Sequence, residues 1–211
     1  MAKKLFNKFS VSLGLLDFIN PIFYTITILT IYNSIKVSLE NPYDFIMFFG
    51  MILSIVFGFI IPFGKVIVGL GIIKFKMPVS LVFLVNTGIL FSGLMLLKYT
   101  FSLNLLFLLI ISIIILFFLF LIYNKSRKMN TIAVLVGAFG YIFIYISLMI
   151  LSFRNNNYLA FLFYLFAIFL FLFLCSIGIK SNLKDPKVHW KIEILNVICQ
   201  GLVSLGTILL L

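Results

Sequence analysis

The amino-acid sequence predicts an all-α, polytopic integral membrane protein, a helix bundle with about seven transmembrane helices. Of its 211 residues, 64% are hydrophobic and only 10% are charged, whereas soluble domains carry about 25% charged residues. The apolar residues form runs of roughly 20, the length that a helix needs to cross the hydrocarbon core of a bilayer. No long polar stretch is left for a soluble domain, so we predict a single transmembrane domain over residues 1–211.

The second observation is the number of these runs. The first follows Lys3, Lys4 and Lys8 as a signal peptide would, but Asp17 interrupts it and it is too long for one, so we assign it to the first helix. Pro62 and Gly64 predict the end of the second helix. We expect the stretch after it, within residues 64–77, to lie at the interface; a re-entrant segment and a tilted continuation of the helix are the alternatives. The seven predicted helices cover approximately residues 11–34, 45–63, 79–99, 103–123, 131–151, 158–179 and 190–211.

The basic residues predict the orientation of the chain. If alternate loops are compared, one side of the membrane holds thirteen of the 16 basic residues and the other holds only Lys36, Lys98 and Arg154. The positive-inside rule places the richer side in the cytoplasm. We therefore expect a multi-pass protein of the cell (cytoplasmic) membrane, with a cytoplasmic N-terminus and an extracytoplasmic C-terminus. Frequent Lys, Phe, Ile and Asn are typical of an AT-rich bacterial genome, which indicates a bacterial inner membrane.

The polarity of the helices predicts how they pack. The fourth and sixth helices are apolar on nearly every face, so we expect them to face lipid. In the fifth helix, Ala133, Gly137 and Tyr141 recur every four residues with Gly140 nearby, a spacing of small residues that lets helices approach closely. We expect the first, second, third, fifth and seventh helices to form the core.

Polar residues concentrate in the first, second, third and seventh helices. In the first and seventh helices they are spaced i, i+3, i+7, which places them on one helix face. Both helices carry an acid followed three residues later by Asn, as parallel repeats would. The candidate solute- or ion-binding residues are Asp17, Asn20, Tyr24, Lys65, Asn86, Glu193, Asn196 and Gln200.

The two acids suggest what this polar face does. A charged side chain at the centre of a spanning helix costs about 2.5–3.5 kcal/mol, so we expect Asp17 and Glu193 to face one cavity in the cytoplasmic half, with Lys65 as the countercharge. The alternative is that they lie at headgroup level, near the positive ends of their helices. Pro21 frees the carbonyl of Asp17 from its helical hydrogen bond, which would suit a cation or a hydrogen-bonding solute; a simple kink is the alternative.

Several functions have no support in the sequence. His189 is the only histidine, so we expect no metal site, no cofactor and no catalytic residues. The glycines before Lys65 do not form a phosphate-binding loop, because Val66 stands where Ser or Thr is needed. Cys175 and Cys199 lie in apolar runs and predict packing. The formal net charge of +11 is explained by membrane orientation, so we expect a lipid bilayer and no nucleic acid as partner.

The best-supported function is a small multi-pass membrane transporter or channel-like protein for a small polar or cationic solute, without enzymatic activity. One alternative is a non-catalytic accessory or assembly subunit, whose aromatic faces would bind another membrane subunit of a larger complex. A lipid-handling membrane enzyme is less favoured, because His and acidic residues for general acid–base chemistry are scarce.

Overall fold

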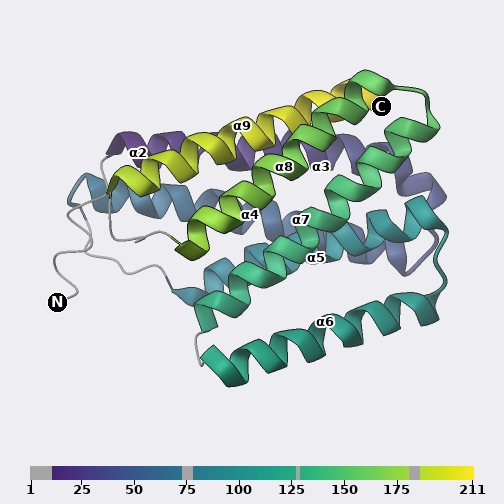
Figure 1. Ribbon diagram of the computed structural model, residues 1–211, viewed down its shortest axis with the longest axis horizontal. Coiled ribbons are helices and arrows are strands. Elements are labelled where there is room, and N and C mark those ends of the chain that lie inside the picture. Colours follow the sequence, from purple (N-terminus) through teal and green to yellow (C-terminus); the bar gives the residue numbers. More distant parts are fainter. Residues whose placement is uncertain (1–10, 73–77, 127–128, 181–185) are drawn as a thin grey trace.

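The computed structural model describes residues 11–72, 78–126, 129–180 and 186–211. These residues form α-helices and one short 3₁₀ helix, with no strand among them (Figure 1). In chain order the elements are α2 (Val11–Asp17), α3 (Ile19–Ile35), η1 (Lys36–Ser38), α4 (Tyr43–Gly69), α5 (Val79–Phe101), α6 (Leu105–Ser126), α7 (Met129–Arg154), α8 (Tyr158–Lys180) and α9 (Pro186–Leu210).

The described part of the chain contains seven helical segments that are long and apolar enough to cross a membrane, which confirms the predicted fold class. The first segment combines α2, α3 and η1, and each of the other six consists of a single helix. The helices run side by side, and α2 begins at the end of the bundle opposite to the one where α9 stops (Figure 1).

The sequence predicted one continuous helix for the first span, whereas in the structure this span is interrupted at Phe18. The N–H of Phe18 bonds to the carbonyl of Leu15 at 3.2 Å, and the N–H of Ile22 reaches the carbonyl of Phe18 at 3.4 Å. Between these bonds, Pro21 offers no N–H to the carbonyl of Asp17 and its ring crowds that carbonyl. The break therefore lies beside the first predicted site residue.

The second span is longer and more continuous than the sequence predicted. The prediction that it ends at residue 63, with an interfacial segment after it, was wrong for residues 64–69, because α4 continues through Pro62 to Gly69. Pro62 is buried in the bundle, where contacts with neighbouring helices compensate for the missing hydrogen bond. The chain then turns at Gly71, whose φ of 74° suits glycine. Residues 73–77 of the predicted segment lie outside the described residues.

The centre of the bundle is a close contact of α5 with α4 and α7. A Cβ at Gly88 of α5 would lie 2.7 Å from the backbone nitrogen of Ser54 in α4. A Cβ at Gly140 of α7 would lie 2.6 Å from the backbone nitrogen of Leu90 in α5. The predicted close approach at the small residues of the fifth helix is thus confirmed.

The fourth and sixth spans are the least enclosed, as expected. In α6 and α8, 17% of the apolar stretch is buried, against 28% to 39% in the other five spans. Figure 1 shows α6 at the edge of the bundle, beside α7. One face of α8 is nevertheless enclosed, since Ala160, Tyr164 and Ala167 are fully buried.

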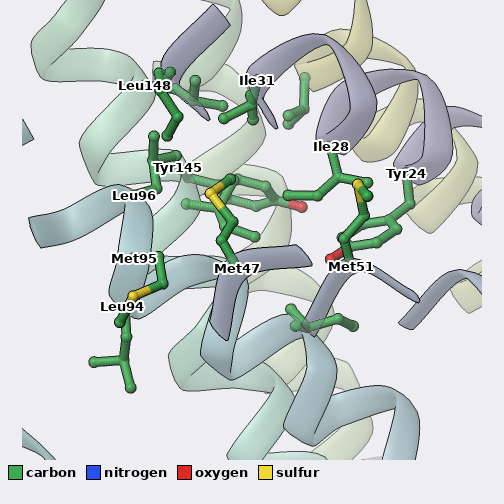
Figure 2. Packing of buried hydrophobic residues seen from close by; sticks show 14 of the residues in the cluster. Tyr24, Ile28, Ile31, Met47, Met51, Leu94, Met95, Leu96, Tyr145 and Leu148 are labelled. Atoms are coloured by element: carbon green, nitrogen blue, oxygen red, sulfur yellow. The ribbon is translucent and has the colours of Figure 1, made fainter. Parts of the chain in front are cut away.

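A layer of apolar side chains fills the bundle between its two ends. Ile28 and Ile31 of α3, Met47 of α4, Leu96 of α5 and Leu148 of α7 have no exposed surface. Figure 2 shows these side chains between the helices, with Tyr24 and Tyr145 in the same cluster. Ile28 and Ile31 lie about one and two turns beyond Tyr24 along α3. The apolar layer therefore closes the interior of the bundle beyond Tyr24.

Candidate functional site

Four of the predicted site residues meet where α2 ends and α3 begins, beside the first turns of α9 and the last turns of α4. The ammonium of Lys65 lies 2.5 Å from Asp17 Oδ2 and 3.3 Å from Glu193 Oε1. The side-chain amide of Asn20 donates hydrogen bonds to Asp17 Oδ1 at 3.3 Å and to Glu193 Oε2 at 3.2 Å. The two carboxylates therefore share one ammonium and one amide group. We call Asp17, Asn20, Lys65 and Glu193 the charged cluster.

Local sequence brings the members of this cluster within reach of one another. Gly14 lets α2 lie directly on α4, since a Cβ there would be 2.9 Å from Val66 Cγ2. Asp17 follows one turn later, as the last residue of α2, and Lys65 precedes Val66 on α4. A larger residue at position 14 would push α2 away from the lysine.

The charged cluster is largely removed from water. The side chain of Lys65 is 26% exposed and those of Asp17 and Glu193 are 12% exposed each. With both carboxylates ionised, these three side chains carry a formal charge of −1. Partial burial strengthens the interaction of the two negative charges, so a proton or a second cation would be stabilised beside them.

A cavity of about 140 Å³ adjoins the charged cluster on the side of Asp17 and Asn20. A cavity of similar size, about 150 Å³, can hold a benzene molecule, so this one has room for a ligand of about six non-hydrogen atoms. Its wall comes from α2, α3, α4, α5 and α7, and it consists of Asp17, Asn20, Pro21, Tyr24, Ser54, Gly58, Ile61, Pro62, Val85, Ile89 and Tyr141.

Two buried polar atoms of the residues in this wall are unsatisfied. Asn20 Oδ1 and the hydroxyl of Tyr24 have no hydrogen-bond partner among the described residues. Leaving a buried polar group unpaired costs about 1–3 kcal/mol, and such groups are normally satisfied by protein or water. A water molecule or a solute in the cavity could supply the missing partners.

Two prolines of the wall each leave a backbone carbonyl of a neighbouring wall residue without its helical N–H donor. Because proline has no N–H, Pro21 leaves the carbonyl of Asp17 without its helical partner, and Pro62 does the same for Gly58. All four residues line the cavity. A Cβ at Gly58 would lie 3.6 Å from Pro21 Cβ, so α3 and α4 meet at this point.

Five predicted residues lie outside the cavity wall, and two of them, Lys65 and Glu193, belong to the charged cluster. The expectation that Glu193, Asn196 and Gln200 share one cavity with Asp17 was wrong, because none of the three lines it. Gln200 lies two turns beyond Glu193, where its amide donates to the hydroxyl of Tyr145 at 3.1 Å. Asn86 donates instead to the carbonyl of Ala133 at 2.8 Å and joins α5 to α7.

Other wall residues were not predicted from the sequence. Pro62 and Gly58 were missed because the proline was interpreted as a helix end, and Tyr141 because its spacing indicated packing. Their side chains share a site only through the crossing of α3, α4, α5 and α7. The one available signal was a proline in each of the first two spans, four residues after Asp17 and Gly58.

The described residues contain no group of three or more His, Cys, Asp or Glu side chains that could hold a metal ion. The arrangement offers instead an acceptor-rich cavity beside an ammonium and two carboxylates, which is suited to binding a polar or positively charged solute. Comparison with protein-family models, with curated proteins and with solved structures found no match.

Proposed function

We propose that this chain is a small multi-pass membrane transporter or channel-like protein for a small polar or cationic solute. The observation that carries the proposal is the cavity of about 140 Å³ beside the charged cluster, inside a bundle of seven apolar spans. Charged side chains within membrane spans are costly, and they commonly line the route of an ion or a solute.

The charge distribution supports a cytoplasmic position for this site. Lys36, Lys98 and Arg154 lie at the end opposite to the charged cluster: Lys98 stacks over the ring of Tyr43 at 4.1 Å, and Arg154 donates to the carbonyl of Thr100 at 2.5 Å. Of the other basic residues, those that the structure describes lie toward the end of the bundle that holds the cluster, in the last turns of α4, α6 and α8 and the first turns of α9. The positive-inside rule then puts the cavity in the cytoplasmic half of the cell membrane.

The apolar layer favours a transporter over an open channel. A solute in the cavity would meet the fully buried side chains of Ile28, Ile31 and Met47 on its way to the opposite end. Passage therefore requires the helices to rearrange. The interruption at Phe18 and the prolines at positions 21 and 62 supply points at which α3 and α4 can bend.

The experiment is transport by the purified protein in proteoliposomes. Cation movement is measured as gradient-driven current with Na⁺, K⁺, choline and ethylammonium, and neutral solute movement by light scattering with urea and glycerol. We expect the wild type to exceed empty liposomes for at least one probe. Asp17→Asn combined with Glu193→Gln should abolish that activity, while Glu40→Gln, at an exposed acid outside the site, should not.

A different result would contradict the proposal. If the wild-type protein moved none of these probes faster than empty liposomes, transport of small polar or cationic solutes would be refuted. The same activity in the double variant would show that the charged cluster takes no part in it.

A further inference from the structure

The polar atoms of the cavity wall are mainly acceptors. The carboxylate of Asp17, Asn20 Oδ1 and the proline-freed carbonyls of Asp17 and Gly58 can only accept hydrogen bonds. The donors nearby are already engaged: the amide of Asn20 gives its two hydrogens to the two carboxylates, and the hydroxyl of Ser54 donates within its own helix, to Gly50 and Met51. In this wall, only the hydroxyls of Tyr24 and Tyr141 can act either as a hydrogen-bond donor or as an acceptor. A ligand that fits this wall supplies N–H donors.

The sign of the charge leads to the same conclusion. Asp17 lines the cavity, whereas Lys65, whose ammonium lies 2.5 Å from Asp17 Oδ2, does not. The wall of the cavity therefore contains one acidic residue and no basic residue. Since two carboxylates share one ammonium, a ligand with one positive charge would balance the cluster. An anion would face the carboxylate and the acceptors together.

The size and the apolar part of the wall define the rest of the ligand. A bare alkali ion would occupy little of about 140 Å³. Among the lining residues, Ile61, Val85 and Ile89 offer an apolar surface for a short carbon chain. The rings of Tyr24 and Tyr141, which meet edge to face with centroids 6.2 Å apart, add aromatic surface that attracts cations.

The geometry points to a short-chain primary alkylammonium ion, of about four to seven non-hydrogen atoms, as the ligand of this cavity. Its ammonium group binds at Asp17, Asn20 and the carbonyl of Gly58, and its chain lies against the apolar side chains of α4 and α5. The inference rests on the proposed function and names the substrate class of that site.

The test is binding of n-butylammonium to the detergent-purified full chain, measured by calorimetry and by the rise in unfolding temperature. Three further probes, compared at equal ionic strength, each change one feature of n-butylammonium. Tetramethylammonium keeps the positive charge but has no N–H donors. The compound n-butanol keeps the carbon chain without the charge, and butyrate carries the opposite charge. We expect saturable binding of n-butylammonium, at least tenfold tighter than that of each of the others. Stronger or equal binding of any of the three would overturn the inference.

Two variants locate the binding site. Asp17→Asn should weaken the binding of n-butylammonium at least tenfold, and Gly58→Val should do so by filling the cavity. A Cβ at position 58 makes only an ordinary contact at 3.6 Å, and the unfolding temperature of the ligand-free variant shows whether valine is accommodated. Gly201→Ala is its control, with Phe23 Cε2 as the nearest atom at 3.4 Å. Unchanged binding in Gly58→Val would overturn the inference.

This experiment separates the inference from the proposed function. Binding is measured without a membrane gradient, so absence of n-butylammonium binding overturns the amine site even where proteoliposomes move another solute. Conversely, tight binding that is lost in Gly58→Val supports the amine site even where no flux is found, and it is then the transport function that fails.

Discussion

Removal of the Lys65 ammonium is expected to destabilise the protein more than removal of the whole set of charges. Lys65→Met keeps the length of the side chain but leaves Asp17 and Glu193, each only 12% exposed, with the amide of Asn20 as their shared donor. Two partly buried carboxylates then face each other without a countercharge.

The structure sets the size of this effect. Loss of one partner of a buried ion pair costs about 3–5 kcal/mol. We expect about 3 kcal/mol, at the lower end, because the Lys65 side chain retains 26% exposure and water can partly replace it. Adding Asp17→Asn leaves one carboxylate, and adding Glu193→Gln as well leaves none. The triple variant should recover about 2 kcal/mol relative to Lys65→Met.

The assay is unfolding by SDS in lipid bicelles, followed by the fluorescence of Trp190, the only tryptophan. Lys36→Met serves as the control, because Lys36 is exposed and its ammonium donates to the exposed side chain of Asn33 at 3.2 Å rather than to a buried group; a change within about 0.5 kcal/mol is expected. Additive losses, with the triple variant less stable than Lys65→Met, would show that the cluster is not a coupled unit.

The remaining predictions concern packing and topology. Gly140→Ala should destabilise by about 2 kcal/mol in the SDS assay, because its Cβ would lie 2.6 Å from the backbone of Leu90, whereas Gly201→Ala should change stability little; equal losses would refute the helix contact. Alkaline phosphatase fused after Leu211 should be active and green fluorescent protein fused at the same site should be dark, and the reverse pattern would contradict the predicted extracytoplasmic C-terminus.

The membrane fold follows from features that act locally in the sequence. Apolar runs of about 20 residues specify spans whatever their neighbours, because each helix satisfies its own backbone. The charged cluster was also predictable in part: burying Asp17 and Glu193 is costly, and Lys65 was the cation closest to their expected depth. The i, i+3 spacing placed Asn20 on the face of Asp17, where it bonds to both carboxylates.

The rest depends on how the helices cross. Pro62 was interpreted as a helix end from its local cost, but burial in the bundle lets α4 continue to Gly69. Gln200 shares a helix face with Glu193, yet two turns further on α9 packs against Tyr145 of α7. The cavity itself exists only where α2, α3, α4, α5 and α7 meet, so no spacing within one helix predicts it.

The most direct measurement of the central claim, a cation-selective cavity at Asp17, is the reactivity of a cysteine at position 58. Gly58→Cys is made together with Cys175→Ala and Cys199→Ala. The purified protein is treated with the cationic 2-aminoethyl and the anionic 2-sulfonatoethyl methanethiosulfonates, and each rate is divided by that of free cysteine. We predict at least tenfold faster reaction with the cationic reagent, a ratio that Asp17→Asn lowers. No reaction, or faster reaction with the anion, would contradict the account.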